Sequence, residues 1–190
     1  MEWQDWIIRE FEGLAWAFSL NGGGQVPRER WTERPDASPS IAWTLWHVAR
    51  TQDLIVNVIL RGRPQVLDAG FGERLGSSSR EIGTSMAETD LANFDAVIHC
   101  EELERYWHAV LTETKSWLAT ADLTTLDQRP PTQERLRSAG VWHAAGGEWL
   151  PDFWGQQSGE FLLRFPSLAH GYMHFGESQV VAARLGYKGS

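Results

Sequence analysis

Four long segments of the chain carry apolar side chains at a period of about 3.6 residues, the period of an α-helix. They cover residues 2–20, about 40–60, about 99–120 and about 166–185. We find no convincing run of alternating apolar and polar residues of the kind that is typical of a strand. The sequence therefore predicts an all-α fold, a four-helix bundle with long connectors between its helices.

Start and stop signals mark the ends of these helices. The second helix is expected to begin near Ser38-Pro39-Ser40, because serine is a good N-cap and proline suits the first helical position. The last helix could begin as early as Glu160, with a kink at Pro166. Gly186 is predicted to be the glycine that ends it.

Two long connectors separate the helices, over residues 62–96 and 121–158. The first is predicted to be mostly irregular, with room for short helical turns. The second contains a stretch at 140–149 that mixes glycines with aromatic residues and favours a small hairpin or a lid. Connectors this long are uncommon in compact domains and are often functional.

Length and composition limit the class of protein. A chain of 190 residues is the size of one domain, here residues 1–190, and 42% hydrophobic with 22% charged residues is a globular composition. A net charge of −8 and the absence of a basic stripe disfavour binding to nucleic acid. The simplest interpretation of the eleven tryptophans is that they fill the core, although some could line a ligand pocket.

The same sequence argues against a membrane or secreted protein. No run of about 18 apolar residues is present, which predicts no membrane span. The first residues lack the positive and apolar regions of a signal peptide. Cys100 is the only cysteine, so an intramolecular disulfide and a cysteine-rich metal site are both excluded. We therefore expect a cytoplasmic protein.

Three histidines are candidates for one metal site. His170 and His174 are four residues apart, which places them on one face of the last helix, roughly 6 Å apart along its axis. Two imidazoles so placed can reach one ion at Zn–N distances of about 2.0–2.1 Å. His47 is the best third ligand, because it lies on the inward stripe of another long helix. The alternative is that each is an ordinary hydrogen-bonded core histidine.

The remaining candidate groups favour structural roles. We expect His99 to have a capping or surface role, His108 to lie at a helix boundary, and Cys100 to be an unreactive thiol. His143 could line a pocket, although a structural role is the simpler interpretation. The motifs of zincin proteases, di-iron bundles, P-loop proteins, α/β-hydrolases and dinucleotide-binding proteins are absent.

Three stretches make the chain recognisable. They are Ser-Ile-Ala-Trp-Thr-Leu-Trp-His-Val-Ala-Arg at residues 40–50, Glu-Glu-Leu-Glu-Arg-Tyr-Trp at 101–107, and the pattern His170-x-x-x-His174-x-Gly176-Glu177. In these the chain resembles the DinB/YfiT-like family of metal-dependent bundle proteins. The likeness follows helix order and spacing over nearly the whole chain and is weakest in the connector 121–158.

This resemblance implies a bundle in up-down-down-up order that holds one divalent ion, usually zinc or nickel. The family pattern places the ligands at His47, His170 and His174. It also implies a homodimer, because dimers are common in the family. Some relatives transfer low-molecular-weight thiols such as bacillithiol, mycothiol or glutathione, and others isomerise substrates with a thiol cofactor.

The hypothesis from the sequence is a thiol S-transferase that acts on a small-molecule substrate. Three neutral imidazoles leave a coordination position open, where a thiol can lose its proton and then attack an electrophile. Glu177 could orient a ligand histidine or move a proton, or it could form a plain salt bridge. Arg50 could pair with a carboxylate of the thiol cofactor, or it could form an ion pair at the rim.

Three other functions remain open from the sequence. A metal-dependent hydrolase would use the open position for hydroxide and Glu177 as its base. A non-catalytic stress protein would bind a metal or a small apolar ligand without turnover. A purely structural bundle would hold the three histidines in ordinary hydrogen bonds.

Overall fold

The structure is a computed structural model that describes residues 2–77, 79–141 and 149–187. All regular secondary structure in these ranges is helical, so the predicted all-α class is confirmed. The four longest helices match the four predicted segments. They are α1 (Trp3–Ala17), α2 (Ile41–Asp53), α5 (Cys100–Leu118) and α9 (His170–Arg184).

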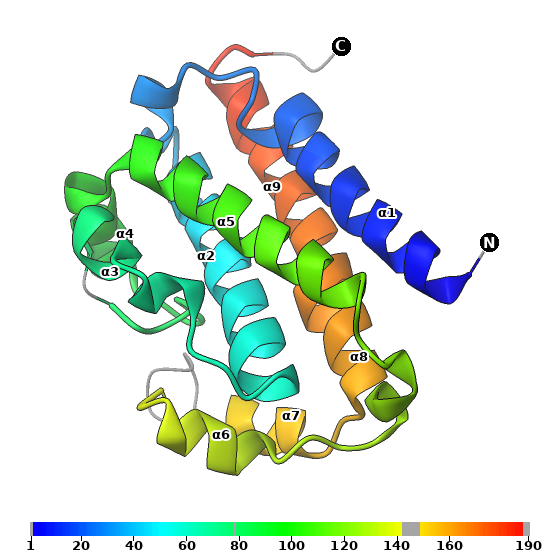
Figure 1. Ribbon diagram of the computed structural model, residues 1–190. Coiled ribbons are helices and arrows are strands. Elements are labelled where there is room, and N and C mark those ends of the chain that lie inside the picture. The colour runs from blue at the N-terminus through cyan, green and yellow to red at the C-terminus, as the bar shows by residue number, and fades with distance from the viewer. Residues whose placement is uncertain (1, 78, 142–148, 188–190) are drawn as a thin grey trace.

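These four helices pack with their axes roughly aligned. In Figure 1, α1 and α9 run from the lower end of the molecule to the upper end, and α2 and α5 run in the opposite direction. α2 contacts both α5 and α9, and α1 contacts the same two helices. The main apolar core lies between them and includes Phe11, Leu45, Trp107 and Phe175.

Three of these helices adjoin a π-helical turn at one end. α1 continues through Phe18–Gly22 and α2 through Leu54–Leu60, while α9 follows directly on Phe165–Ala169. α8 (Gly159–Arg164) precedes this last turn, so the C-terminal helical segment begins near Glu160, at the earlier of the two predicted starts. π-helical turns often occur at functional sites.

The disruption expected at Pro166 takes the form of this π-helical turn. Proline has no backbone N–H, so it cannot donate to the carbonyl of Leu162 four residues earlier. The hydroxyl of Ser167 donates to that carbonyl oxygen instead, at 3.1 Å. The helix therefore widens here and continues into the turn that carries His170.

The helix ends agree with the sequence in one case and differ in another. Gly186 has a φ of +94°, and the N–H of Tyr187 donates to the carbonyl of Ala182 at 2.9 Å, so the predicted C-terminal glycine is confirmed. The N-cap of α2 is Ser40, whose Oγ accepts from the backbone N–H of Trp43. Pro39 therefore precedes the cap, and its predicted place at the first helical position was wrong.

α2 is buried on every side, although the sequence predicted only one buried face. Every residue from Ile41 to Asp53 is buried, because α4 (Glu88–Val97) covers part of the helix that α5 and α9 leave open. The carboxylate of Asp53 accepts hydrogen bonds from the backbone N–H groups of Val66 and Leu67, at 2.9 and 3.0 Å. These bonds attach the following connector to the helix.

Both connectors contain helices that the sequence left undefined. The first holds the 3₁₀ turn Val66–Asp68, α3 (Phe71–Arg74) and α4. The second holds the 3₁₀ turn Leu123–Asp127, α6 (Thr132–Ser138) and α7 (Leu150–Gly155). A further 3₁₀ turn, Arg28–Arg30, lies between α1 and α2.

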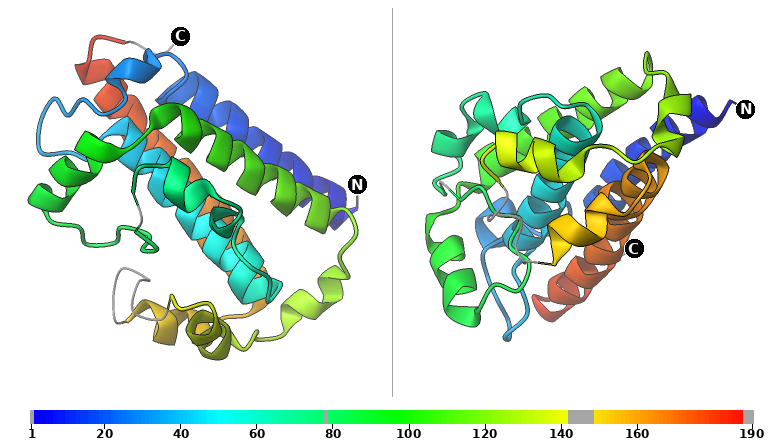
Figure 2. Two further views of the ribbon diagram at one scale, coloured as in Figure 1. Left: turned by 60° about the vertical axis from the view of Figure 1, so that its left-hand side comes forward. Right: turned by 90° about the horizontal axis from the view of Figure 1, so that it is seen from below.

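The helices α6 and α7 form a second small core at one end of the molecule. They contact each other, as the right-hand view of Figure 2 shows, and α6 also packs on the π-helical continuation of α2. Leu54, Ile59, Leu136 and Trp154 belong to this second apolar cluster. The predicted hairpin or lid at 140–149 lies largely outside the described residues, which omit 142–148.

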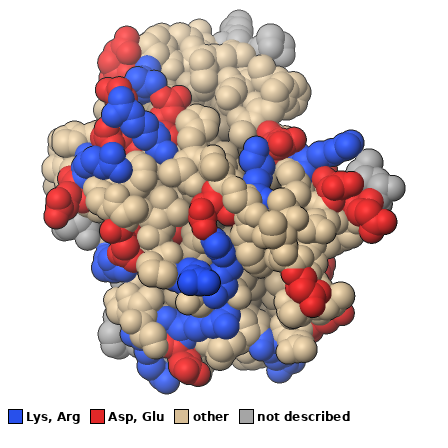
Figure 3. Space-filling view, viewed as in Figure 1, with Lys and Arg blue, Asp and Glu red and all other residues tan. Residues whose placement is uncertain are grey.

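Acidic and basic side chains alternate over the face in Figure 3, and neither sign forms a continuous field there. Among the described residues, no helix has both the length and the apolar content of a membrane span.

Candidate metal centre

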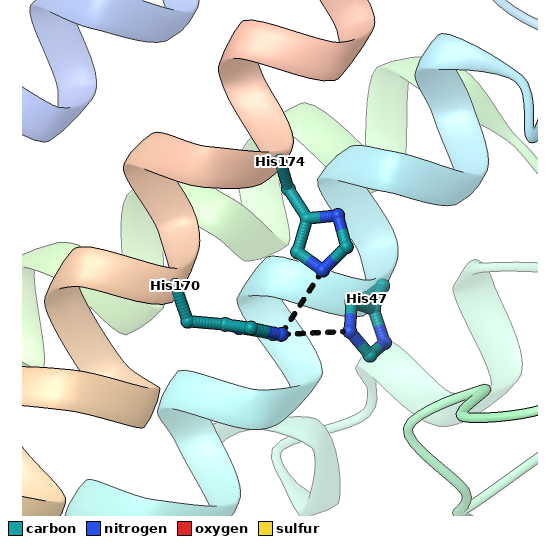
Figure 4. Close-up of side chains that lie close together, drawn as sticks. All are labelled: His47, His170 and His174. Atoms are coloured by element: carbon teal, nitrogen blue, oxygen red, sulfur yellow. Dashed lines mark hydrogen bonds between the residues drawn. The ribbon is translucent and has the colours of Figure 1, made fainter.

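Three histidines from two helices converge on one point, as Figure 4 shows. α2 contributes His47, and consecutive turns of α9 contribute His170 and His174. The Nε2 atom of His170 lies 3.3 Å from Nε2 of His47 and 3.0 Å from Nε2 of His174. Two nitrogens of a tetrahedral zinc site are about 3.3 Å apart, so these two separations suit one divalent ion, and all three ligand atoms lie within 4.8 Å of one another. Among the described residues these three form a group that could hold a metal.

The outer nitrogens of two of these rings face oxygen acceptors. Nδ1 of His47 contacts the carbonyl oxygen of Ile82, and Nδ1 of His174 lies 2.7 Å from Oε2 of Glu177. Both Nδ1 atoms must then carry a hydrogen, which leaves a lone pair on each Nε2. This is the usual outer shell of a metal-bound histidine, with one carbonyl and one carboxylate.

The three Nε2 atoms cannot all be paired by hydrogen bonds with one another. His170 can offer at most one hydrogen on Nε2, while the Nε2 atoms of His47 and His174 both present lone pairs to it. A cation at the centre accepts all three lone pairs at once. The chemistry of the donor set therefore fits a divalent ion better than a hydrogen-bonded cluster.

Burial keeps two of the rings neutral. His47 is 4% exposed, and loss of hydration lowers its pKa to about 4. Burial, followed by the nearby His47 and His174, lowers the pKa of His170 to about 3. A neutral imidazole is the form that binds a metal, so both rings are ready to do so near neutral pH.

The groups that hold His47 in place were not predicted from the sequence. The indole of Trp43 stacks on its ring, with centroids 4.8 Å apart and an angle of 6° between the planes. Gly83 follows Ile82 with a φ of +85°, and a Cβ there would lie 2.6 Å from the ring of Trp46. Only glycine fits so close to α2, and this close approach brings the Ile82 carbonyl to His47.

Glu177 contacts one of the candidate ligands. Its side chain is 66% exposed, and its carboxylate pairs with Nδ1 of His174. This one contact is compatible with both an orienting role and a plain salt bridge. It can hold the ring so that Nε2 points to the centre.

Arg50 does not lie where the sequence hypothesis needs it. Its side chain is fully buried, and its guanidinium donates to Gln65, to the hydroxyl of Tyr106 and to the carbonyls of Arg80 and Glu81. It also lies 3.7 Å from the carboxylate of Asp53. This placement differs from both sequence interpretations, a ligand-binding arginine and an ion pair at the rim. We therefore leave Arg50 out of the site.

His99, His108 and Cys100 take no part in the cluster. His108 is exposed, and Nδ1 of His99 bonds the carbonyl of Arg74 at 2.7 Å on the surface. Burial raises the pKa of the Cys100 thiol to about 11, which agrees with an unreactive cysteine. His143 lies outside the described residues.

No protein-family model matches this chain, and no curated protein sequence matches it either.

Proposed function

We propose that this chain is a metal-dependent enzyme of the DinB/YfiT-like type. Its four long helices would form that family's four-helix bundle in up-down-down-up order. The directions of α1, α2, α5 and α9 in Figure 1 support this proposal. The origin of the histidines, one from α2 and two from α9, supports it as well.

The observation that carries the proposal is the convergence of three imidazole Nε2 atoms within reach of one ion, with burial keeping His47 and His170 neutral. His47, His170 and His174 would hold zinc or nickel. Such an ion, when bound, supplies Lewis acidity that lowers the pKa of a thiol or a water molecule that reaches it. The Ile82 carbonyl and Glu177 would keep the hydrogen on Nδ1 of His47 and of His174, which leaves each Nε2 free to bind the ion.

The reaction that we propose is transfer of a low-molecular-weight thiol to an electrophile. The thiol loses its proton to solvent, and its sulfur forms a bond to the electrophilic carbon with its own electron pair. The leaving group departs with the electrons of the bond that breaks. Bacillithiol, mycothiol and glutathione are the thiols to test.

Hydrolysis is the weaker candidate, because it requires a free general base. Glu177 is the one carboxylate that the sequence suggested for that role, and it is engaged with His174. A metal-binding stress protein without turnover is the remaining alternative. It predicts a bound ion and no reaction.

The test is a turnover assay with the purified protein, zinc or nickel, each thiol in turn and a chlorinated nitrobenzene. We expect release of chloride that needs both metal and thiol. It should disappear in His170→Ala and His174→Ala and persist in His108→Ala, which removes an exposed histidine. Hydrolysis of activated esters with no added thiol would favour the hydrolase. Bound metal with neither activity would favour the stress protein.

A further inference from the structure

A cavity of about 160 Å³ adjoins two of the three histidines. His47 and His170 line it together with Trp149, Phe153 and Phe165. We call this cavity the aromatic pocket. A cavity of roughly 150 Å³ is large enough for a benzene ring. The pocket therefore offers space for one small ring next to the candidate metal centre.

The described wall of the aromatic pocket carries no formal charge. No lysine, arginine, aspartate or glutamate is among the described residues that line it. In the metal-free chain, a charged ligand group placed here would lose its hydration and gain no ionic partner from these residues. The pocket therefore selects against carboxylates and phosphates.

Three of the aromatic side chains that line the aromatic pocket are also exposed to solvent. Trp149 is 58% exposed, Phe153 38% and Phe165 42%. Their rings form a continuous row through Phe161, with centroid separations of 5.6 to 6.1 Å. Exposed apolar surface of this kind marks a place where another apolar group binds.

Two buried polar atoms belong to residues that line this apolar wall. The hydroxyl of Thr51, a residue that is only 2% exposed, has no hydrogen-bond partner among the described residues. Nδ1 of His170 also lacks one, although Nδ1 of His47 and Nδ1 of His174 each have an oxygen acceptor. Both atoms are closed to a water molecule in this structure. Buried polar groups are normally paired, so a small side-chain shift that let a ligand oxygen reach them would satisfy both.

We propose that the aromatic pocket binds a compact uncharged ring that carries a neutral oxygen, such as a hydroxyl or carbonyl group. The ring packs against Phe153 and Phe165, and the oxygen bonds with the hydroxyl of Thr51 or Nδ1 of His170. As the substrate class of the metal centre, this inference rests on the proposed function. In thiol transfer the pocket receives the electrophile, since a carboxylate-bearing thiol has no ionic partner in it.

The experiment measures dissociation constants of toluene, benzyl alcohol and benzoate by ligand-observed NMR. Each probe is titrated into the full chain, both with metal and after chelation. In the chelated chain we expect benzyl alcohol to bind most tightly and benzoate to bind more than about a hundredfold more weakly. Binding of benzoate to the chelated chain as tight as that of benzyl alcohol would overturn the inference, whereas tighter benzoate binding only with metal would report ligation of the ion.

Matched variants assign the contacts. Phe165→Ala should weaken toluene and benzyl alcohol alike, by about three- to tenfold. Thr51→Val keeps the shape of the side chain and should weaken benzyl alcohol alone, by about two- to tenfold. Trp16→Ala removes a side chain that is 65% exposed and outside the pocket, and it should change neither constant. Equal weakening of both probes by Thr51→Val would overturn the role of the hydroxyl.

The two proposals fail in different ways. Probe binding to a chain that takes up no metal would uphold the aromatic pocket and reject the metal-dependent function. Uptake of one metal without probe binding at millimolar concentration would reject the pocket and leave the metal-dependent function standing.

Discussion

Glu177 reaches the candidate centre through one hydrogen bond to His174. Glu177→Gln keeps the length of the side chain but removes the charge that favours a hydrogen on Nδ1. Losses of such outer contacts typically weaken metal binding by about 10- to 100-fold. We expect a zinc dissociation constant about tenfold higher or more, measured by competition with a chromogenic chelator.

The control for this change is Glu160→Gln. Glu160 is also an exposed carboxylate one turn from its partner, and it pairs with Arg164 at 2.8 Å. We expect no change in zinc affinity there. Equal weakening in both variants would mean that surface charge, and not the contact with His174, affects the ion.

The buried position of Arg50 predicts an effect on folding. Arg50→Ala leaves the carboxylate of Asp53 buried without its cation, which should lower the free energy of unfolding by about 3–5 kcal/mol. Urea denaturation measures this loss. Arg105→Ala removes the two ion pairs of an exposed arginine, with Glu101 and Glu102, and should cost about 1 kcal/mol or less. A stable Arg50→Ala variant with impaired use of thiol would restore the ligand-binding hypothesis.

At the scale of the helices, α9 packs most closely where it carries a glycine beside its first ligand. A Cβ on Gly171 would lie 3.0 Å from a methyl of Leu14 on α1 and 3.3 Å from one of Val48 on α2. At contacts this short, the side chains of Leu14 and Val48 must shift by a few tenths of an ångström to admit a Cβ. The absence of a side chain at this position therefore sets how near His170 comes to His47.

This packing predicts opposite effects at two glycines of the same helix. Nothing lies within 4 Å of a Cβ at Gly176, so Gly176→Ala should stabilise the chain by up to about 1 kcal/mol through helix propensity. Gly171→Ala should gain less or lose stability, with a difference of about 1–2 kcal/mol between the two. Chemical denaturation of the metal-free variants measures it. Equal gains at both positions would contradict the close packing of α9.

Apolar periodicity predicted the long helices because each buries a stripe that spans several turns. It missed α4, whose buried residues are only Leu91 and Phe94. It also identified only one inward stripe of α2, because nothing local in the sequence reveals that Arg50 and Asp53 are paired in the interior. Such partners come from distant segments and appear only in the folded chain.

The candidate ligands were predictable from spacing along two helices, and the groups around them were not. The i, i+4 pair and an inward histidine on another helix are visible in sequence. The acceptor for His47 is the backbone carbonyl of Ile82, and a backbone group has no sequence signature. The packing of Gly83 on Trp46 depends on how the connector folds onto α2.

For the whole molecule, the neutral histidines predict how stability changes with pH. Burial lowers the pKa of His47 to about 4 and that of His170 to about 3, below the value of about 6.5 in an unfolded chain. Below that value the unfolded chain binds protons that the folded chain does not. The contribution of these rings is therefore full above pH 6.5 and is lost as the pH falls.

Urea denaturation of chelated protein at pH 7.5 and 5.5 tests this sign. Between pH 7.5 and pH 5.5, we expect the free energy of unfolding of the parent to fall by about 1–3 kcal/mol more than that of the double variant His47→Gln/His170→Gln. Burial raises the pKa of Asp95 to about 6, which makes its own contribution fall as the pH rises, but this term is common to both proteins. The same pH dependence in parent and variant would contradict the assignment.

Metal content is the most direct test of the whole account. Elemental analysis of the purified, untagged protein should find about one equivalent of zinc or nickel per chain. The ion should be lost in His47→Ala and His170→Ala and retained in His108→Ala. No bound metal in the parent after incubation with both ions, or full metal in the two ligand variants, would contradict the proposed centre.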